Sequence, residues 1–326
     1  MGPPYDQTTA VLGETPTIAV DVPISSVFIL LFIIGAAGHV TRFQLNLRRG
    51  HKFLPSAASF AFCITRIVAN ALRIAWAIYP SDVPISIAAQ IFVVAGVVIP
   101  LIINLLYAQR ILRAAHPNIG WSRPLSRTLW AVYLVITLNL VMIIATTVQS
   151  FYTLDTFTRL IDVDLLCYGT SLFAAVASLP LAIITYVLLA PRQKEAQDHF
   201  GHGTLRSKCL IVGTAATLIS LGAWFRAVVN YQPPRPMNDP AWYHSKSCFY
   251  VLTFILEIIV VYGYFFSRAD LRLYVPDGSS KRRHYRLPIL GADLDNTEGQ
   301  RHLKDSKSDS PEGSSFQILE PFPLLN

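Results

Sequence analysis

The sequence predicts an all-α polytopic membrane protein, a bundle of seven transmembrane helices with its N-terminus outside and its C-terminus in the cytosol. Three observations predict this fold class. Seven long apolar runs fill residues 23–266, and the connections between them alternate in basic charge. The chain is 52% hydrophobic and only 14% charged, whereas soluble domains carry about 25% charged residues. A lipid-facing surface explains the missing charge.

Each run is long enough to cross a bilayer as a helix. About 20 apolar residues are needed, because the hydrocarbon is roughly 30 Å thick and a helix rises about 1.5 Å per residue. Isolated strands would leave backbone groups unpaired in lipid. Pro100 and Pro180 fall inside the third and fifth runs, and we expect them to kink those helices. The expected spans are Pro23–Val40, Leu54–Ile78, Ile85–Tyr107, Leu129–Val148, Leu165–Leu189, Leu210–Val229 and Cys248–Phe266.

The basic residues of the connections predict the orientation. Cytosolic connections of membrane proteins carry an excess of Lys and Arg. The first, third and fifth connections hold Arg42, Arg48, Arg49, Lys52, Arg110, Arg113, Arg123, Arg127, Arg192, Lys194, Arg206 and Lys208, whereas the other three hold Arg159, Arg235 and Lys246. We therefore expect the first set in the cytosol and the second set outside.

The two ends of the chain differ in composition from the bundle. Residues 1–22 contain acidic residues but no Lys or Arg, and we expect them to be an extracellular N-terminal segment. The seven-helix bundle is expected to cover residues 23–272. From about Asp277 onward, small, polar and charged residues dominate. Such composition is typical of disorder, so residues 273–326 are expected to be a disordered cytosolic tail.

Charged side chains inside the spans are the candidate functional residues, because burying charge in lipid is costly. The second span holds Arg66 and Arg73, the sixth holds Arg226 and the seventh holds Glu257. Arg66, Asn70 and Arg73 are spaced so that they share one helix face. That face is expected to point into the bundle or toward a wet cavity.

The depth of these residues indicates how they are paired. Arg66 and Glu257 both fall near the middle of their spans, where an unpaired charge costs at least about 2.5–3.5 kcal/mol on insertion scales. We therefore expect an Arg66–Glu257 ion pair. Tyr250, Thr253, Glu257 and Tyr264 form a polar stripe that is expected to face inward. Three interpretations remain open: a structural network, a ligand or substrate site, and proton coupling through Glu257.

Arg73 and Arg226 both fall in the outer halves of their spans, near the level of several tryptophans. Guanidinium groups bind carboxylates and phosphates in a bidentate manner. The two arginines are therefore candidates to receive an anionic group. The alternative for Arg226 is that its side chain reaches up to the outer interface.

Cys167 and Cys248 both fall at outer ends of spans. Because the outside is oxidising, a disulfide between them is one interpretation, and buried free thiols are the other. No phosphate-binding loop, metal-ligand pattern or catalytic order of residues is recognisable in the spans. We therefore expect no metal, no cofactor and no catalytic residue. The net charge of +7 lies mostly in connections and tail, which indicates contact with anionic membrane lipids and not with nucleic acid.

The stretch from the sixth span to the tail is distinctive. It contains Trp224-Phe225-Arg226, Pro233-Pro234-Arg235-Pro236, Ala241-Trp242-Tyr243 and Arg268-Ala269-Asp270-Leu271-Arg272. In these segments the chain resembles an uncharacterised family of fungal seven-span membrane proteins, a domain of unknown function. It is more weakly similar to the fungal RTA-like lipid-translocating exporters, which share the seven-span plan and a Phe-Arg near the end of span six. The exporter pattern has an acidic residue shortly afterwards, where this chain has Val228, Val229 and Asn230.

These observations leave three functional hypotheses. The first is a non-enzymatic protein that transports, exports or otherwise handles a lipid-like or amphipathic small molecule. The second is a receptor-like membrane sensor. The third is a membrane-embedded enzyme or an accessory protein of a fungal metabolite pathway, although such acid chemistry usually needs more than one buried carboxylate. The resemblance implies a plasma-membrane or endomembrane location.

Overall fold

The computed structural model describes residues 2–6, 9–50, 52–191 and 200–275. Most of the expected tail, residues 276–326, lies outside this range. Six long helices are α1 (Ile18–Arg48), α2 (Leu54–Ile78), α3 (Val83–Ala115), α5 (Arg123–Tyr152), α6 (Thr156–Leu189) and α7 (Leu205–Asn230). A seventh long segment, Lys246–Phe266, consists of α8 (Lys246–Phe249), η3 (Tyr250–Ile255) and α9 (Leu256–Phe266). The short elements are α4 (Pro117–Gly120), η2 (Trp242–His244) and α10 (Ala269–Arg272).

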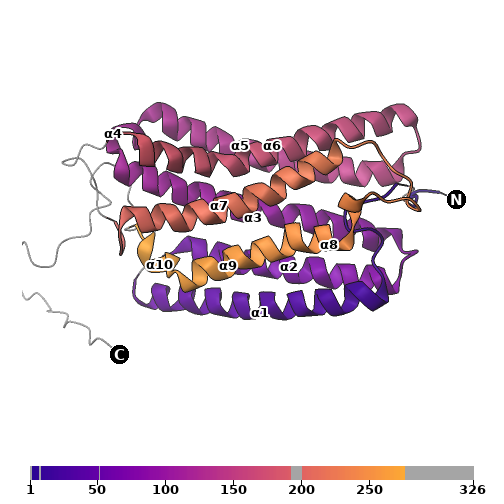
Figure 1. Cartoon of the computed structure of the whole chain (residues 1–326), viewed down its shortest axis with the longest axis horizontal. Coiled ribbons are helices and arrows are strands. Elements are labelled where there is room, and N and C mark those ends of the chain that lie inside the picture. Colours follow the sequence, from indigo (N-terminus) through magenta and orange to yellow (C-terminus); the bar gives the residue numbers. More distant parts are fainter. Residues whose placement is uncertain (1, 7–8, 51, 192–199, 276–326) are drawn as a thin grey trace, which may run out of the picture. The chain divides into compact units, whose positions relative to one another are not determined.

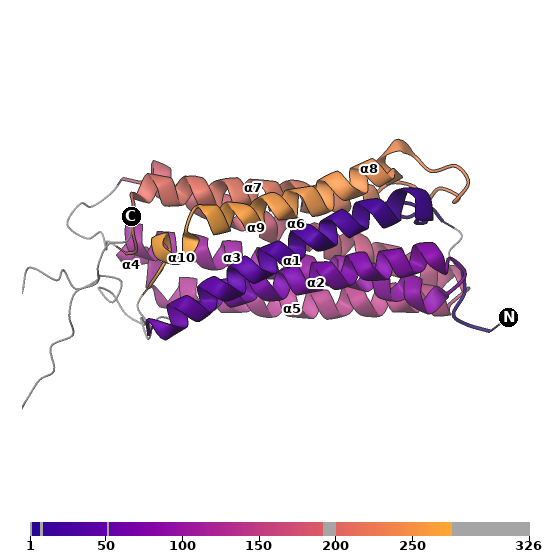
Figure 2. The same cartoon turned by 90° about the horizontal axis from the view of Figure 1, so that it is seen from below.

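The predicted fold class is confirmed. All seven long segments are long and apolar enough to cross a membrane, and they run side by side (Figures 1 and 2). Within the described ranges, extended pairing is limited to one β-bridge between Thr9 and Pro236. We call the end of the bundle that holds residues 9–17 and 231–245 the N-terminal face. The opposite end, with residues 116–122 and 267–275, is the C-terminal face.

Most helices extend beyond the apolar runs that predicted them. Only α2 has the expected bounds, whereas α1 already begins at Ile18, inside the expected N-terminal segment, and continues to Arg48. The extra turns contain polar residues, and a side chain caps the first turn of α3, α6 and α7. Asp155, for example, accepts a hydrogen bond at 2.9 Å from the backbone N–H of Thr158 at the start of α6. Apolar runs mark the part of a helix that lies in lipid, and not the ends of the helix.

The seventh span departs from a regular α-helix. Its six residues Tyr250–Ile255 form a π-helix between two α-helical stretches. Such wide turns are rare, occur mostly as single turns within α-helices, and often lie at functional sites. Composition predicted one uninterrupted helix here, so this irregularity is a finding of the structure.

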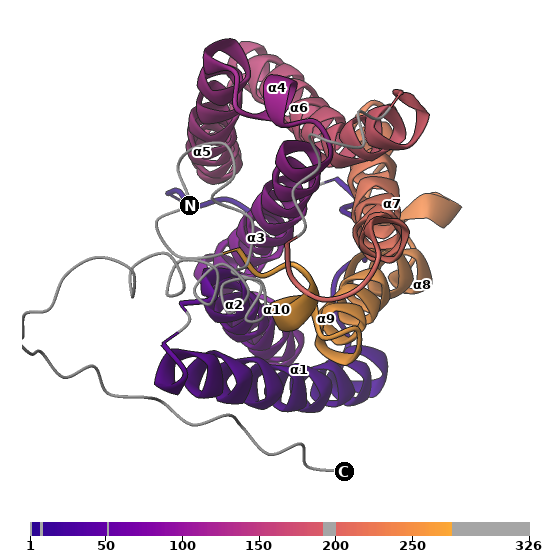
Figure 3. The same ribbon diagram turned by 90° about the vertical axis from the view of Figure 1, so that its left-hand side faces the viewer.

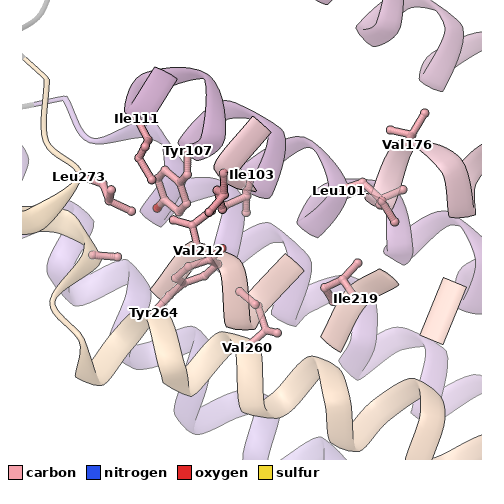
Figure 4. Packing of buried hydrophobic residues seen from close by; sticks show 14 of the residues in the cluster. Leu101, Ile103, Tyr107, Ile111, Val176, Val212, Ile219, Val260, Tyr264 and Leu273 are labelled. Atoms are coloured by element: carbon pink, nitrogen blue, oxygen red, sulfur yellow. The ribbon is translucent and has the colours of Figure 1, made fainter. Parts of the chain in front are cut away.

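Helix α3 lies at the centre of the bundle. It packs against α2, α5, α6 and α7, and the view along the helices shows it between these neighbours (Figure 3). The apolar core around α3 includes Tyr107, Val212 and Tyr264, whose side chains point toward one another (Figure 4). The rings of Tyr107 and Tyr264 meet edge to face with centroids 5.1 Å apart. In lipid such close packing drives helix association, because lipid tails are as apolar as the core.

Polar contacts join the helices at the C-terminal face. The Asp270 carboxylate pairs with Arg42 of α1 at 3.2 Å and accepts a hydrogen bond from Asn46 at 3.4 Å. Arg110 of α3 donates a hydrogen bond to the carbonyl of Leu273 at 2.7 Å. The segment after the seventh span is therefore held against α1 and α3.

The N-terminal segment folds over the N-terminal face. The N–H of Ala10 donates to the carbonyl of Arg235 at 2.9 Å, and the N–H of Gly13 donates to the carbonyl of His244 at 2.8 Å. Gly13 has a φ of +88°, and a Cβ there would meet the Phe249 ring at 2.6 Å, so glycine is required. Residues 9–17 and 231–245 thus form one layer.

Candidate functional site

Arg66 is fully buried in the middle of α2, with 0% of its side chain exposed. Its Nη2 donates to Oε1 of Glu257 in α9, and the two groups form an ion pair. Its Nη1 donates to the backbone carbonyls of Val93 at 2.8 Å and Phe92 at 3.3 Å, both in α3. One guanidinium therefore joins three helices at mid-bundle.

The sequence makes room for this guanidinium. A Cβ at Gly96 of α3 would lie 2.6 Å from Arg66 Nη1, so any larger residue would displace the arginine. The rings of Phe62 and Phe254 lie 5.3 and 5.6 Å from the centre of the guanidinium. Apolar rings stabilise a cation through their π faces, and they also lower the local dielectric, which strengthens the ion pair.

Around this ion pair, several buried polar atoms have no hydrogen-bond partner among the described residues. They are Arg66 Nε, Asn70 Oδ1, Arg226 Nη1, Thr253 Oγ1 and Glu257 Oε2. We call these five residues the central polar cluster. They come from α2, α7, η3 and α9. Most buried polar groups in proteins are paired, so a set of unpaired donors and acceptors in one region requires an explanation.

Asn70 illustrates the pattern. Its Nδ2 donates to the backbone carbonyl of Arg66 at 2.8 Å, one turn earlier in α2. Its Oδ1 has no partner among the residues described, although the side chain is fully buried. The amide is therefore held in a fixed orientation with one acceptor unused.

Arg226 lies on the inward side of α7, between the buried residues Gly222, Ala223 and Val229. It is close enough to Glu257 and Arg66 to interact electrostatically with both. It makes no hydrogen bond or ion pair with any described residue, and its Nη1 is buried. The central polar cluster thus contains two cations and one carboxylate. Its Nη1 is buried, whereas the residue as a whole keeps some accessible surface.

The π-helix is part of this site. It carries Thr253, which is 1% exposed and whose hydroxyl has no partner in the part of the chain that the structure describes. A Cβ at Gly222 of α7 would lie 2.6 Å from the backbone oxygen of Leu252, so glycine allows the π-helix to approach α7 closely. The sequence signal was Gly222 itself, since an isolated glycine in an apolar helix often marks close backbone approach.

The packing around the site is incomplete on the side of α3. Residues 90–95 of α3 all keep some accessible surface. Six consecutive residues point in every direction around a helix, so the surrounding helices do not enclose this stretch fully. Phe92 and Val93, which accept from Arg66, belong to it. The accessible stretch therefore lies directly beside the central polar cluster.

Arg73 belongs to a different group of contacts, near the N-terminal face. Its guanidinium binds the Asp21 carboxylate of α1 at 2.8 Å, and it donates to the carbonyl of Gly13 at 2.5 Å. Asp21 is 0% exposed and also binds Lys246 at 2.6 Å and the hydroxyl of Tyr250 at 2.8 Å. The structure therefore does not bring Arg73 and Arg226 together. An anion does bind Arg73, but it is a carboxylate of the same chain.

The sequence missed this group because Asp21 was assigned to the segment before the first span. Its carboxylate accepts a further hydrogen bond from the backbone N–H of Thr17 at 2.7 Å. A signal existed in the sequence: Asp21 and Lys246 lie close to the expected outer ends of the first and seventh spans. Opposite charges at the same depth are natural partners.

The two outer cysteines are free thiols. Cys167 donates to the carbonyl of Asn230 at 3.1 Å, and Cys248 lies 3.7 Å from the carbonyl of Trp242. The structure therefore shows no disulfide between them. Both thiols are held by backbone carbonyls instead.

Comparison with known proteins does not assign a function to this chain. No curated protein and no solved structure matches the chain. One family model matches part of it, the region from just before α7 to just after α10. This region holds Arg226, Thr253 and Glu257 of the central polar cluster. Residues 200–274 are thus similar to a family described as a protein of unknown function, DUF3112.

Proposed function

We propose that this chain is a non-enzymatic carrier that binds an amphipathic, lipid-like small molecule and moves it across the plasma membrane or an endomembrane. The observation that carries the proposal is the central polar cluster, with five buried polar atoms at mid-bundle that lack partners in the described part of the chain. The weaker resemblance to fungal lipid-translocating exporters, through Phe225-Arg226, supports the same class of molecule.

A purely structural role explains only part of the cluster. The Arg66–Glu257 pair alone would neutralise the charge in α2 and α9. It leaves Asn70, Thr253 and Arg226 with unused donors or acceptors, each of which costs about 1–3 kcal/mol when buried. Polar groups that project into a membrane bundle commonly mark substrate pathways. A ligand head group, with water, would supply the missing partners.

The incomplete packing around residues 90–95 supports access to the cluster. Apolar residues surround Gln90 in this stretch, so a hydrocarbon chain would find a compatible environment there while a polar head reached Arg66. This division into apolar and polar walls suits an amphipathic molecule.

The test is transfer of fluorescent phospholipids across vesicle membranes. The full chain is reconstituted, and the fraction of phosphatidylcholine or phosphatidylglycerol, fluorescently labelled on one acyl chain, that an impermeant quencher reaches is followed over time. Wild-type protein should accelerate transfer of at least one probe over empty vesicles. Thr253→Val should slow it about fivefold, the value of roughly one hydrogen bond. Because the Thr253 hydroxyl has no partner among the described residues, this change should not impair folding.

The matched control is Thr217→Val in α7. Thr217 is exposed, and its hydroxyl donates only to the carbonyl of Gly213, at 2.9 Å. Its transfer rate should equal that of wild type. Wild-type vesicles that move neither probe contradict the proposed transport. A Thr253→Val variant as fast as wild type contradicts the assignment of the site.

A further inference from the structure

The charges of the central polar cluster do not balance. Arg66 and Arg226 are cations, since arginine stays protonated in proteins, and among the described residues Glu257 is the one carboxylate that interacts with them. With Glu257 ionised, the cluster carries one positive charge in excess. An excess charge buried near the middle of a membrane bundle is costly unless something neutralises it.

Three other arginines of the long helices are each paired with a carboxylate. Arg42 pairs with Asp270, Arg66 pairs with Glu257, and Arg73 pairs with Asp21. Arg226 has neither an ion pair nor a hydrogen bond among the described residues. Its guanidinium is therefore the one of these four that lacks a carboxylate of its own within that part of the chain.

The unused hydrogen-bonding atoms define the missing partner. Within the described ranges, Arg226 Nη1 and Arg66 Nε are N–H donors without acceptors. Two oxygens of one oxyanion suit two guanidinium donors. Glu257 Oε2 and Asn70 Oδ1 are acceptors without donors in the same ranges, and they suit hydroxyl groups or water beside the anion.

From this geometry we propose that the central polar cluster binds a monoanionic oxyanion head group, a carboxylate or a phosphodiester, with Arg226 as its counter-ion. This inference rests on the proposed function and names the class of its substrate. One negative charge makes the cluster neutral. A cationic head group would double the excess positive charge, and a dianion would leave an excess of negative charge.

The test is equilibrium binding to the purified full chain in a neutral detergent. The probes are oleate for the carboxylate, phosphatidylglycerol for the phosphodiester, and oleyl alcohol and phosphatidylcholine as the uncharged and zwitterionic comparisons. Wild type should bind at least one anionic probe tenfold or more tightly than the two comparisons. Arg226→Met should weaken that binding about thirtyfold, as expected for a charge-assisted hydrogen bond.

Thermal stability separates a ligand role from a structural one. Because Arg226 has no partner in the described chain, Arg226→Met should unfold at the same or a higher temperature than wild type without probe. The matched control is Arg206→Met at the exposed start of the same helix, which should leave binding unchanged. If Arg226→Met does not reach the membrane, Arg226→Lys keeps the charge but loses Nη1, and it should bind about tenfold more weakly.

The outcomes are distinct. Equal binding of all four probes, or anion binding that Arg226→Met and Arg226→Lys leave unchanged, overturns the charge assignment. If vesicle transfer of phosphatidylcholine is active while no anionic probe binds, this inference fails and the proposed function stands. If anions bind through Arg226 but no lipid is transferred, transport fails and the binding site stands.

Discussion

His244, at the N-terminal face, links the fold to pH through a single ring nitrogen. The ring is buried, and its Nδ1 accepts a hydrogen bond from the backbone N–H of Ala241 at 3.2 Å. Burial lowers the pKa of His244 below its usual value of 6.5, and nearby Arg235 lowers it further, against a smaller opposite effect of Glu14. The neutral ring is therefore the form that the folded chain favours.

We predict that the layer formed by residues 9–17 and 231–245 loosens in acid. An unfolded histidine binds a proton below about pH 6.5, whereas folded His244 resists it until a lower pH. The stability contributed by neutral His244 is complete above pH 6.5 and falls as the pH drops toward the lowered pKa. Hydrogen exchange at Gly13 and Ala241, corrected for intrinsic rates, should rise between pH 7.5 and 5.5.

The control variant is His244→Asn, whose side-chain oxygen can accept the Ala241 hydrogen bond without titrating. It should show the same corrected exchange at both pH values. A wild-type layer that exchanges equally at pH 7.5 and 5.5 would show that His244 titrates alike in the folded and unfolded chain.

Single residues show where sequence reasoning succeeded and where it stopped. Depth and helix periodicity placed Arg66 opposite Glu257, because both sit in the middle of clearly apolar runs. The same reasoning missed Asp21, since α1 begins before its apolar run does. It placed Arg73 beside Arg226 because both lie in outer halves, yet depth does not say which face of the bundle a side chain reaches.

At the scale of elements, the Arg66–Glu257 pair couples α2 to α9. Arg66→Ala or Glu257→Ala should each reduce the yield of folded protein strongly, because removing one member of a buried pair costs about 3–5 kcal/mol. The exchanged double variant, Arg66→Glu with Glu257→Arg, should recover much of the yield. It should not recover lipid transfer, because a carboxylate at position 66 cannot donate to the carbonyls of Val93 and Phe92. Yield is measured in membranes and by size-exclusion chromatography.

Recovery of both yield and transfer by the double variant would make the pair a structural connection alone. Full yield of either single variant would show that the charge at this depth is neutralised in another way.

The contact between α7 and the π-helix depends on Gly222. Gly222→Ala should push the Leu252 backbone away and lower both the melting temperature and the transfer rate, since the added Cβ has no room. Gly213→Ala in the same helix is the control, because its Cβ would meet only Ile184, at 3.9 Å. That change should stabilise the helix by up to about 1 kcal/mol. Equal melting temperatures for the two variants would contradict the close approach.

Six of the spans are continuous helices that hydropathy located well, because lipid requires long apolar helices. The π-helix of the seventh span could not be predicted in this way. Its wide turns depend on how η3 packs against Gly222 of α7, which is a contact between distant parts of the chain. Local composition carries no record of such a contact.

For the whole molecule, the charge of the connections predicts which face meets the cytosol. We expect the N-terminal face outside. Two introduced cysteines, made one at a time, test this orientation. Pro240→Cys places a thiol in the exposed 231–240 connection, and Arg206→Cys places one at the exposed start of α7, at the opposite end of the bundle. In intact cells, a membrane-impermeant maleimide should label Pro240→Cys, and it should label Arg206→Cys only after permeabilisation. Both are made with Cys248→Ser, since Cys248 is partly exposed. The reverse labelling would invert the proposed orientation.

The hydropathy of the sequence predicted the number of spans. It did not predict that α3 lies at the centre of the bundle. Seven apolar helices of similar length can be arranged in many ways, and the order of packing depends on side-chain shape. Gly96 leaves room for Arg66 of α2 beside α3, and Gly222 leaves room for the Leu252 backbone beside α7.

The π-helix also changes the angular register of the seventh span. A turn that closes one residue later acts like an inserted residue, and residues beyond it are rotated by about 100° relative to an uninterrupted α-helix. Without it, Tyr250 and Glu257, seven positions apart, would share one side. With it, Tyr250 binds Asp21 of α1 and Arg73 of α2, while Glu257 binds Arg66 of α2 and lies close enough to Arg226 of α7 to interact with it electrostatically. The polar side chains of the seventh span thereby contact three other helices.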